Sequence, residues 1–470
     1  MKIVVCVRKS VSGDINPFDA CAYEAALKIR GAEVTLLSMA PPSCEDFLRK
    51  LTRLGASKAI LLADPAFAGA DTLATSYTLS LAVKKLDPDL IICGRQTVDG
   101  DTGQVGPELA TLCSYSLITR AMSVEANEST VTCAKRGGAL VTASYPALIT
   151  VERINTLRRP SIRSKEAPVE IWGAADIDAD LSRCGLSGSP TRVIKSFEND
   201  RGFRKCRFIK SSEVSGVLSS IIKEKHDDCG LSIGKTDAPM LKNVWVVGEP
   251  AMKMASTVSD DIRLIQMDTP ENLARMIEEQ RPYAVLFGSD PHSKEVAPQI
   301  AAILKTGLCA DCTSLETDGS ELFMYRPAFS GNVIAKIRCT TLPVMATLRT
   351  EADEMKNLVF GVGMGAVDSL DRILDTANIL GADVAASRVV VDRGILPYEK
   401  QVGLTGITIS PEVYIALGIS GAVHHIAGMS SAHTVIAVNT DRDAPIFKYA
   451  DYGVLADVSE FIDSIKNNFT

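Results

Sequence analysis

The chain has 470 residues, of which 46% are hydrophobic and 23% charged, so it is a globular protein long enough for about three domains. A net charge of -7 gives no reason to expect nucleic-acid binding, and no apolar run approaches the ~20 residues of a membrane-spanning helix. Because the N-terminus, MKIVVCVRKS, lacks the pattern of a signal peptide and the twelve cysteines form no paired framework, we expect a cytoplasmic protein.

Short apolar, β-branched runs alternate with helix-like stretches through the first ninety or so residues. The predicted strands cover residues 3–7, 34–37, 59–62 and 90–93, and the predicted helices cover 20–30, 44–54 and 71–86. This alternation favours an α/β fold, with a parallel sheet that helices cover on both faces.

A glycine-rich loop follows the fourth predicted strand. It contains Gly100, Asp101, Thr102, Gly103 and Gly106, and Pro107 is expected to start the next helix. Glycines and hydroxyls at a helix N-terminus after a parallel strand suit an adenosine phosphate. The alternative is a plain turn between a strand and a helix.

The first half of the sequence is repeated in the second half. DPDLIICG at 87–94, followed by a loop and GPELATL at 106–112, is echoed by RPYAVLFG at 281–288 and APQIAAIL at 297–304. Two related α/β units would pack as a pseudo-twofold pair with a ligand crevice between them. Residues 226–239, HDDCGLSIGKTDAP, are polar and rich in glycine and aspartate, which is typical of a linker.

The CxxC sequence at Cys309 and Cys312 has no second pair and no histidine at zinc spacing. It therefore favours buried thiols, and we expect no metal site.

The C-terminal part carries four glycine- or small-residue-rich motifs: ASR at 386–388, QVGLTG at 401–406, GISGAVHHIAGM at 418–429 and APIFKYADYGVLAD at 444–457. Small residues after apolar runs let the backbone approach a pyrophosphate, and helix N-termini favour anions. A hydroxyl, an arginine and imidazoles suit a flavin, whose ring gains negative charge on reduction. In order and spacing, the four motifs closely resemble the FAD domain of the large (alpha) subunit of electron transfer flavoproteins.

The resemblance extends over nearly the whole chain. Residues 1–229 resemble the small (beta) subunit through INPFDACAYEAALKIR at 15–30 and CGRQTVDGDTGQVGPELA at 93–110. Residues 242–349 resemble the N-terminal domain of the large subunit through TGLCADCTSLE at 306–316 and RPAFSGNVIAKIRC at 326–339.

The resemblance therefore implies both subunits fused in one chain, beta first. The implied domains are a beta-like nucleotide-binding domain with a C-terminal arm (1–229), a linker (230–241), an alpha-like N-terminal domain (242–350) and an FAD-binding domain (351–470). The implied fold is two related Rossmann-like parallel-sheet units in a pseudo-twofold arrangement, followed by a C-terminal α/β domain that binds FAD.

The resemblance also assigns roles around the C-terminal FAD. Ser387 and Arg388 approach the isoalloxazine, Thr405 bonds its reactive central nitrogen, and the charge or N–H of His425 stabilises the reduced ring. Ser420, Gly421 and Ala422 lie at the pyrophosphate, with Asn439 and Asp457 at the adenosine end. The other expected FAD-binding residues are Gln401, Val402, Gly403, Gly406 and His424. His424 replaces the family's usual glutamine, and its role stays open.

Three residues depart from the family pattern near this flavin. Val362 stands where an arginine is usual, Leu404 replaces a common glutamine, and Ile407 replaces a common lysine. Each change removes a hydrogen-bond donor, so we expect a lower flavin potential or looser binding.

The glycine-rich loop of the beta-like half implies a second nucleotide, which in the family is AMP in ordinary carriers and a second FAD in electron-bifurcating members. The loop sequence GRQTVDGDTGQVGP resembles that of the bifurcating members. The resemblance then implies that Arg326 lies over the second flavin as a catalytic residue. The expected binding residues are Asn16, Phe18, Asp101, Thr102, Gly103, Gln104, Val105 and Gly106.

Three functions follow as hypotheses. The first is an electron carrier whose FAD serves a flavoenzyme of the acyl-CoA dehydrogenase type and another redox partner. It would dock through a basic loop at 153–172, with Leu157 and Ile162 as apolar anchors. The second is NADH-dependent bifurcation, with ferredoxin or flavodoxin as an acceptor, which would make the chain an NADH-oxidising enzyme. The third is a non-redox protein that binds adenine nucleotides.

Overall fold

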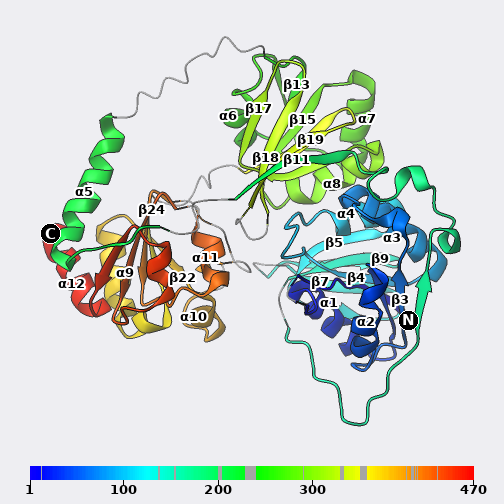
Figure 1. Cartoon of the computed structure of the whole chain (residues 1–470), viewed down its shortest axis with the longest axis horizontal. Coiled ribbons are helices and arrows are strands. Elements are labelled where there is room, and N and C mark those ends of the chain that lie inside the picture. The colour runs from blue at the N-terminus through cyan, green and yellow to red at the C-terminus, as the bar shows by residue number, and fades with distance from the viewer. Residues whose placement is uncertain are drawn as a thin grey trace. The chain divides into compact units, whose positions relative to one another are not determined.

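The structure is a computed structural model that describes residues 1–11, 13–135, 138–152, 155–198, 204–227, 240–288, 290–328, 333–349, 357–397, 400–403, 407, 409, 411–430 and 432–469 (Figure 1). The described residues fall into two compact units. The first unit lies within Met1–Phe197, Ala238–Phe329 and Ile334–Thr350, and the second within Glu198–Asp237, Ser330–Val333 and Glu351–Thr470.

The first half of the first unit is built on a seven-stranded sheet in the order β10-β3-β2-β1-β4-β9-β5, with every pairing parallel. The strands are β1 (Lys2–Cys6), β2 (Glu33–Met39), β3 (Lys58–Leu62), β4 (Leu90–Gly94), β5 (Ser116–Ala121), β9 (Ala147–Val151) and β10 (Val169–Trp172). The helices are α1 (Pro17–Lys28), α2 (Glu45–Thr52), α3 (Thr72–Leu86) and α4 (Val105–Cys113).

Side chains alternate along the strands between two hydrophobic cores. Ile3 and Val5 pack with α1 and α2, whereas Val4 packs with α3 and α4 on the other face. The predicted parallel sheet with helices on both faces is therefore confirmed. The helix α4 begins at Val105 rather than at the predicted Pro107, because a proline within the first helical turn forfeits no intrahelical hydrogen bond.

The second half of the first unit has a five-stranded parallel sheet in the order β14-β13-β15-β20-β16. Its strands are β13 (Val244–Val247), β14 (Ile262–Ile265), β15 (Ala284–Gly288), β16 (Leu308–Cys312) and β20 (Val344–Leu348), and its helices are α6 (Met252–Ala255), α7 (Pro270–Gln280) and α8 (Ser293–Leu304). This order matches β2-β1-β4-β9-β5 of the first half.

The repeat extends to an irregularity in the last strand of each set. Arg120 in β5 and Asp311 in β16 both have a φ of 57°, and each interrupts the ladder register. Their N–H groups donate to the hydroxyls of Thr150 and Thr347 at 2.9 and 2.8 Å. The predicted internal duplication is therefore present in the fold.

The two halves of the first unit exchange equivalent contacts. The helices α4 and α8 pack against each other. Gln104, at the start of α4, donates to the Leu308 carbonyl of β16 at 3.1 Å, while Glu295, in the first turn of α8, accepts from the Thr119 hydroxyl of β5. Reciprocal contacts of this kind are what a pseudo-twofold pair predicts.

Two smaller sheets complete the first unit. One has the order β6-β7-β8, with strands β6 (Glu125–Ala126), β7 (Thr130–Ala134) and β8 (Leu140–Ser144). The other has the order β11-β19-β18-β17, with strands β11 (Thr191–Glu198), β17 (Ser314–Thr317), β18 (Leu322–Ala328) and β19 (Val333–Cys339). Because β11 follows the first half in sequence, this second sheet joins the two halves.

The second unit is a six-stranded parallel sheet in the order β12-β25-β24-β23-β21-β22. Its strands are β12 (Arg207–Phe208), β21 (Leu358–Val362), β22 (Asp383–Ala386), β23 (Val413–Leu417), β24 (Thr434–Asn439) and β25 (Tyr452–Leu455). Its helices are α5 (Ser211–Asp227), α9 (Leu370–Ile379), α10 (Arg388–Asp392), α11 (Val423–Met429) and α12 (Val458–Phe469).

The arm that follows the first half belongs to this second unit. Strand β12 pairs with β25, and α5 packs against α12 (Figure 1). Val214 and Leu218 of α5 are completely or almost completely buried in the hydrophobic core of this unit. Segments far apart in sequence therefore build one domain.

A buried carboxyl links stability to pH in the first unit. Glu108 in α4 is 1% exposed and accepts from the hydroxyls of Thr72 and Ser76 at 3.0 and 2.8 Å. Burial raises the pKa of Glu108 from 4.5 to about 8. The folded state therefore holds a proton that the unfolded chain releases, and its stabilising effect is present below pH 4.5 and lost as the pH rises towards 8.

We expect Glu108→Gln to remove this pH dependence. Relative to the parent, the variant should gain roughly 1.4 kcal/mol in free energy of unfolding per pH unit between pH 5 and 8. Urea unfolding at several pH values measures this gain. The exposed Glu33→Gln should track the parent, and a parallel pH response of Glu108→Gln and parent would contradict the prediction.

Candidate functional site

A pocket of 470 Å³ lies in the second unit, at the carboxyl ends of its parallel strands. Its walls are the loops after β21, β22, β23 and β24, together with the segment 401–403 and one side chain of α11. The lining residues are Gly363, Met364, Gly365, Ser387, Arg388, Val389, Gln401, Val402, Gly403, Gly418, Ile419, Ser420, Ala422, His425, Asn439, Asp441, Ala444 and Pro445. Ligands of open α/β sheets bind at this edge, where the strand order reverses.

Glycines bring the backbone segments of this pocket close together. A Cβ on Gly363 would overlap the Gly418 carbonyl, and Gly418 itself has a φ of +58° against the backbone of Gly365. Gly421 has a φ of +93°, and its Cβ would overlap the Ile446 nitrogen. Only glycine allows this packing, which leaves a pocket wall made largely of backbone.

The pocket brings together most of the predicted flavin residues. Those that line it are Ser387, Arg388, Gln401, Val402, Gly403, Ser420, Ala422, His425 and Asn439. Gly421 lies in the same loop as Ser420 and Ala422. Thr405, Gly406 and the side chain of His424 lie outside the described residues, so their roles stay predictions.

Three other residues that the sequence placed near the flavin lie away from the pocket lining. Asp457 accepts from the N–H and hydroxyl of Ser459 at 2.8 and 2.6 Å, in the first turn of α12. Val362 is completely buried in the hydrophobic core of the second unit, so the loop after β21 lines the pocket through residues 363–365 instead. Ile407 packs against a second core of the same unit, and Leu404 lies outside the described residues.

His425 is the most buried titratable group of the pocket. It is 6% exposed, and its Nε2 lies 2.9 Å from the Tyr414 hydroxyl. Burial lowers the pKa of His425 to about 4. The backbone of Val402, which interacts with the imidazole, raises this pKa to a smaller extent. Its Nδ1 is buried and has no hydrogen-bond partner within the described part of the chain. At neutral pH, His425 therefore offers an uncharged N–H or lone pair rather than a positive charge.

Arg388 lies at the start of α10 and is half exposed. Its Nε forms an ion pair with Asp392, one turn later, at 3.1 Å. It is therefore a cation at the rim of the pocket.

Several residues of this pocket had no individual role in the sequence analysis, although Gly418 opens one of the quoted motifs. Gly363 and Gly418 follow directly after apolar strands and Gly365 lies two residues later, which is a recognisable sign of close backbone approach. Tyr414, which contacts His425 but does not line the pocket, was also missed because it lies within an apolar strand. The sequence feature that could have identified it is a tyrosine within an apolar run, because a buried phenol hydroxyl needs a hydrogen-bond partner.

The glycine-rich loop of the first unit is held by the residues predicted to bind a nucleotide there. The Asn16 side chain donates to the Gln96 carbonyl at 2.9 Å, and the Phe18 ring lies under the Arg95 guanidinium. Gly106 lies against Thr150, which fits close packing of helix and strand. Val105 is the first residue of α4, and the Gln104 side chain donates a hydrogen bond to the Leu308 carbonyl of the second half. Both residues therefore also fix the loop.

Charged side chains from both halves meet at this loop. Arg326, from β18, is 8% exposed and donates to the Gly100 carbonyl at 2.7 Å. Burial raises the pKa of Asp101, and the nearby Asp311 adds to this, whereas Arg95, Arg326 and Lys294 oppose it. The turn of Asp101, Thr102 and Gly103, with positive φ at the first and third, lies directly before α4.

Neighbouring cations lower the pKa of Asp311 by more than burial raises it. Burial favours its neutral form, but Lys294 at 3.3 Å and the guanidinium of Arg349 hold the pKa of Asp311 well below its usual range. With Arg95, which also pairs with the buried Glu152 at 3.0 Å, and Arg326, four cations lie among three carboxylates. An excess of positive charge beside a glycine loop suits phosphate groups.

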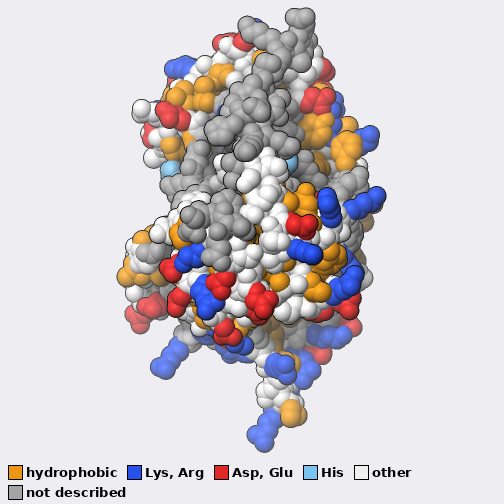
Figure 2. All heavy atoms as spheres, turned by 90° about the vertical axis from the view of Figure 1, so that its left-hand side faces the viewer, with side chains coloured by type: hydrophobic (Ala, Val, Ile, Leu, Met, Phe, Trp, Pro, Cys, Tyr) orange, Lys and Arg blue, Asp and Glu red, His pale blue; other side chains and the backbone are white. Residues whose placement is uncertain are grey.

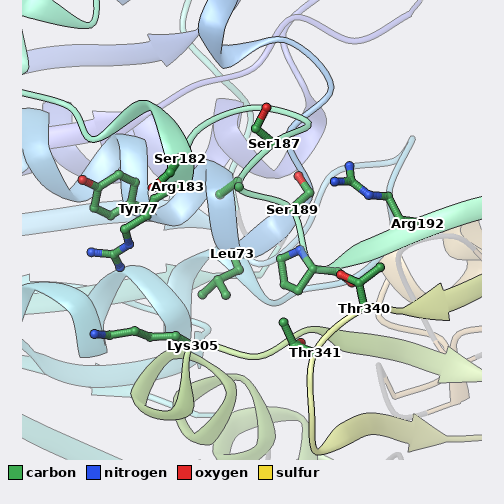
Figure 3. Close-up of a pocket in the computed structure, with 13 residues that line it drawn as sticks. Leu73, Tyr77, Ser182, Arg183, Ser187, Ser189, Arg192, Lys305, Thr340 and Thr341 are labelled. Atoms are coloured by element: carbon green, nitrogen blue, oxygen red, sulfur yellow. The ribbon is translucent and has the colours of Figure 1, made fainter.

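A second pocket of 320 Å³ lies where the two halves of the first unit meet (Figure 3). It is lined by α3, the loop at 182–192 and the second-half residues Lys305, Thr340 and Thr341. The side chains of Arg183 and Lys305 point to one side of it and that of Arg192 to the other. Predicted site residues do not line it, and its cations do not converge on one point.

Among the described residues, no group of three His, Cys, Asp or Glu side chains is placed to hold a metal ion. Within the same part of the chain, no helix has the length and apolar character needed to cross a membrane. Cys309 and Cys312 are buried free thiols.

Parallel sheets with glycine-lined loops at their carboxyl ends define the class of α/β proteins that bind nucleotides. The electron transfer flavoprotein domain model matches residues 3–177 and 258–371, and the electron transfer flavoprotein FAD-binding domain model matches residues 354–430. The chain belongs to the electron transfer flavoprotein family.

Relatives of both subunits match the chain. It is 37% identical over 252 residues to the electron transfer flavoprotein subunit alpha of Thermoanaerobacterium thermosaccharolyticum, covering 43% of this chain and 76% of that protein. It is 38% identical over 232 residues to the subunit beta of Clostridium acetobutylicum, covering 47% and 90%. Subunit CarD of the caffeyl-CoA reductase-Etf complex of Acetobacterium woodii is 37% identical over 235 residues, covering 47% and 90%. The predicted family is confirmed, and the chain carries a beta-like and an alpha-like part.

Proposed function

We propose that this chain is an electron carrier that holds FAD in the pocket of its second unit and serves a partner flavoenzyme of the acyl-CoA dehydrogenase type. The observation that carries the proposal is the 470 Å³ pocket at the strand ends, whose walls lie largely within the stretch matched by the FAD-binding model. FAD, when bound, takes up and releases electrons.

The residues of the pocket fit such a ligand. The backbone of residues 418–422, opened by two glycines of positive φ, suits a pyrophosphate that needs close approach. The buried Nδ1 of His425 is a polar atom that lacks a partner in the described structure and would gain one from a ring carbonyl or nitrogen. Arg388 adds a cation at the rim.

Replacement of Arg388 tests this assignment. We expect Arg388→Ala to weaken FAD binding roughly tenfold or to lower the flavin potential, because the guanidinium stabilises negative charge on the ligand. Arg372→Ala is a matched control, since Arg372 forms an exposed ion pair with Asp463 at 3.0 Å in the same unit, outside the pocket lining. Titration of FAD into the flavin-free protein and a potentiometric titration measure both effects. Unchanged affinity and potential would count against the site.

The described part of the predicted docking segment, residues 155–172, is the proposed docking surface for the partner (Figure 1). Arg158 fixes its base, because its Nε and Nη2 donate to both oxygens of Glu24 at 3.0 and 2.9 Å. Leu157 packs against the core of the first half, so of the two predicted anchors Ile162, with a fully exposed side chain, is the one presented to a partner. On the face drawn in Figure 2, basic and acidic side chains are intermixed.

A second candidate function is electron bifurcation, with a second FAD at the glycine-rich loop and NADH as the electron donor. Two observations favour it: the cluster of Arg95, Lys294, Arg326 and Arg349 around that loop, and the similarity to a subunit named for a caffeyl-CoA reductase-Etf complex. If AMP binds at this loop instead of a second FAD, the chain transfers electrons through one flavin and does not bifurcate them.

A further inference from the structure

Tyr414 is a buried phenol held in a specific place beside the candidate FAD pocket. It lies in β23 and has no exposed surface. Its hydroxyl passes over Gly361 of the neighbouring strand β21, where a Cβ would overlap the oxygen. The glycine therefore provides the space that the hydroxyl occupies.

The Tyr414 hydroxyl has one partner within the described part of the chain, which is Nε2 of His425 at 2.9 Å. Burial raises the pKa of Tyr414 above its usual range, so the phenol keeps its proton. In a neutral imidazole one ring nitrogen carries a proton and the other carries a lone pair. The hydrogen bond with the Tyr414 hydroxyl determines which of the two nitrogens is protonated.

One arrangement of this pair leaves fewer buried groups without a partner than the other, because it leaves only the Nδ1–H unpaired among the described residues. If the hydroxyl donates to Nε2, its proton is satisfied and the imidazole proton lies on Nδ1. If Nε2 instead donates to the hydroxyl oxygen, the phenol proton and the lone pair of the buried Nδ1 both lack partners among the described residues. Each further buried polar group without a partner destabilises the folded protein, so the first arrangement is favoured.

We infer that Tyr414 is a positioning residue that holds His425 in the Nδ1–H form and so presents a neutral N–H donor to FAD in the pocket. The inference rests on the proposed function and deepens it. Acceptor atoms of the flavin ring gain negative charge on reduction, so this N–H binds the reduced form more strongly than the oxidised form.

Nitrogen NMR of the flavin-free protein tests the tautomer directly. With ¹⁵N-labelled histidine, and with His425→Ala to identify the signals, the parent should show His425 protonated at Nδ1. Tyr414→Phe should shift the population towards Nε2–H, while Tyr452→Phe, the same change in β25 of the same sheet, should leave the signals unchanged. The measurement on the parent requires no variant at position 414. A parent protonated at Nε2 would overturn the role of Tyr414.

A double-variant comparison tests the effect on the flavin. Tyr414→Phe should weaken binding of reduced FAD relative to oxidised FAD by roughly fivefold, the size of one ordinary hydrogen bond. In the His425→Ala background the same change should have no effect. An equal effect in both backgrounds would overturn the inference, because the tyrosine would then act without the histidine. Protein that binds no FAD in either form would overturn the proposed function and with it the ligand.

Discussion

Gly421→Ala should leave the purified protein almost without FAD, and added FAD should not restore it. The backbone at residue 421 has a φ of +93°, which costs an L-residue about 1–2 kcal/mol, and the new Cβ would overlap the backbone nitrogen of Ile446. That nitrogen also donates to the Ser420 carbonyl at 3.0 Å. Relief of the overlap has to move the loop at 418–422 away from the pocket, so we expect a loss in FAD affinity of at least roughly a hundredfold.

Gly381→Ala is the matched control for this prediction. Gly381 also has a positive φ, +63°, but its added Cβ would meet no atom within 4 Å, and it lies in the turn between α9 and β22. It should therefore cost some stability and leave FAD content unchanged. Flavin absorbance per chain and thermal unfolding separate loss of ligand from loss of fold. Equal FAD content in Gly421→Ala and the parent would show that this loop is not at the flavin.

Arg326→Ala should remove the second nucleotide and spare the first. The guanidinium is buried, donates to Gly100 and faces Asp101, so it fixes the loop and adds positive charge there. Loss of a buried, charge-assisted contact costs about 1.5–3 kcal/mol, which is roughly ten- to a hundredfold in nucleotide affinity. Chromatography of released nucleotides measures this loss, and NADH oxidation should fall with it if the second nucleotide is FAD.

Arg338→Ala serves as the control for Arg326→Ala. Arg338 lies on the neighbouring strand β19 and forms a half-exposed ion pair with Glu321 at 3.3 Å. Its loss should leave both nucleotides in place. A full complement of nucleotides in Arg326→Ala would contradict the assignment of Arg326.

Much of the fold was predictable because local patterns decide it. The apolar runs that became β1 to β4 and the helices between them were located within a few residues, since each strand is buried on both faces. The internal repeat was also visible, and both copies begin with a residue in the left-handed region, Asp87 and Arg281, before the strand.

Long-range contacts set the rest of the fold. Nothing in the local sequence of Arg207 and Phe208 indicates that they pair with a strand more than two hundred residues later. The insertion of β9 between β4 and β5 likewise depends on packing across the sheet.

The candidate site was predictable in its motifs and less so in its chemistry. Glycines and small residues after apolar strands marked the loops that line the pocket. The protonation of His425 was not predictable, because it depends on burial and on a tyrosine contributed by another element. Val362 packs in the core directly before the pocket-lining Gly363, and its side chain does not line the pocket, because successive side chains at a strand end point to opposite faces.

Extraction of the bound nucleotides from the purified chain tests the central claim most directly. Denaturation followed by chromatography should release one FAD per chain from the pocket of the second unit, and AMP or a second FAD from the loop of the first. Gly421→Ala should lose only the former and Arg326→Ala only the latter. A parent chain that releases no FAD, and that takes up none when incubated with an excess, would contradict the account.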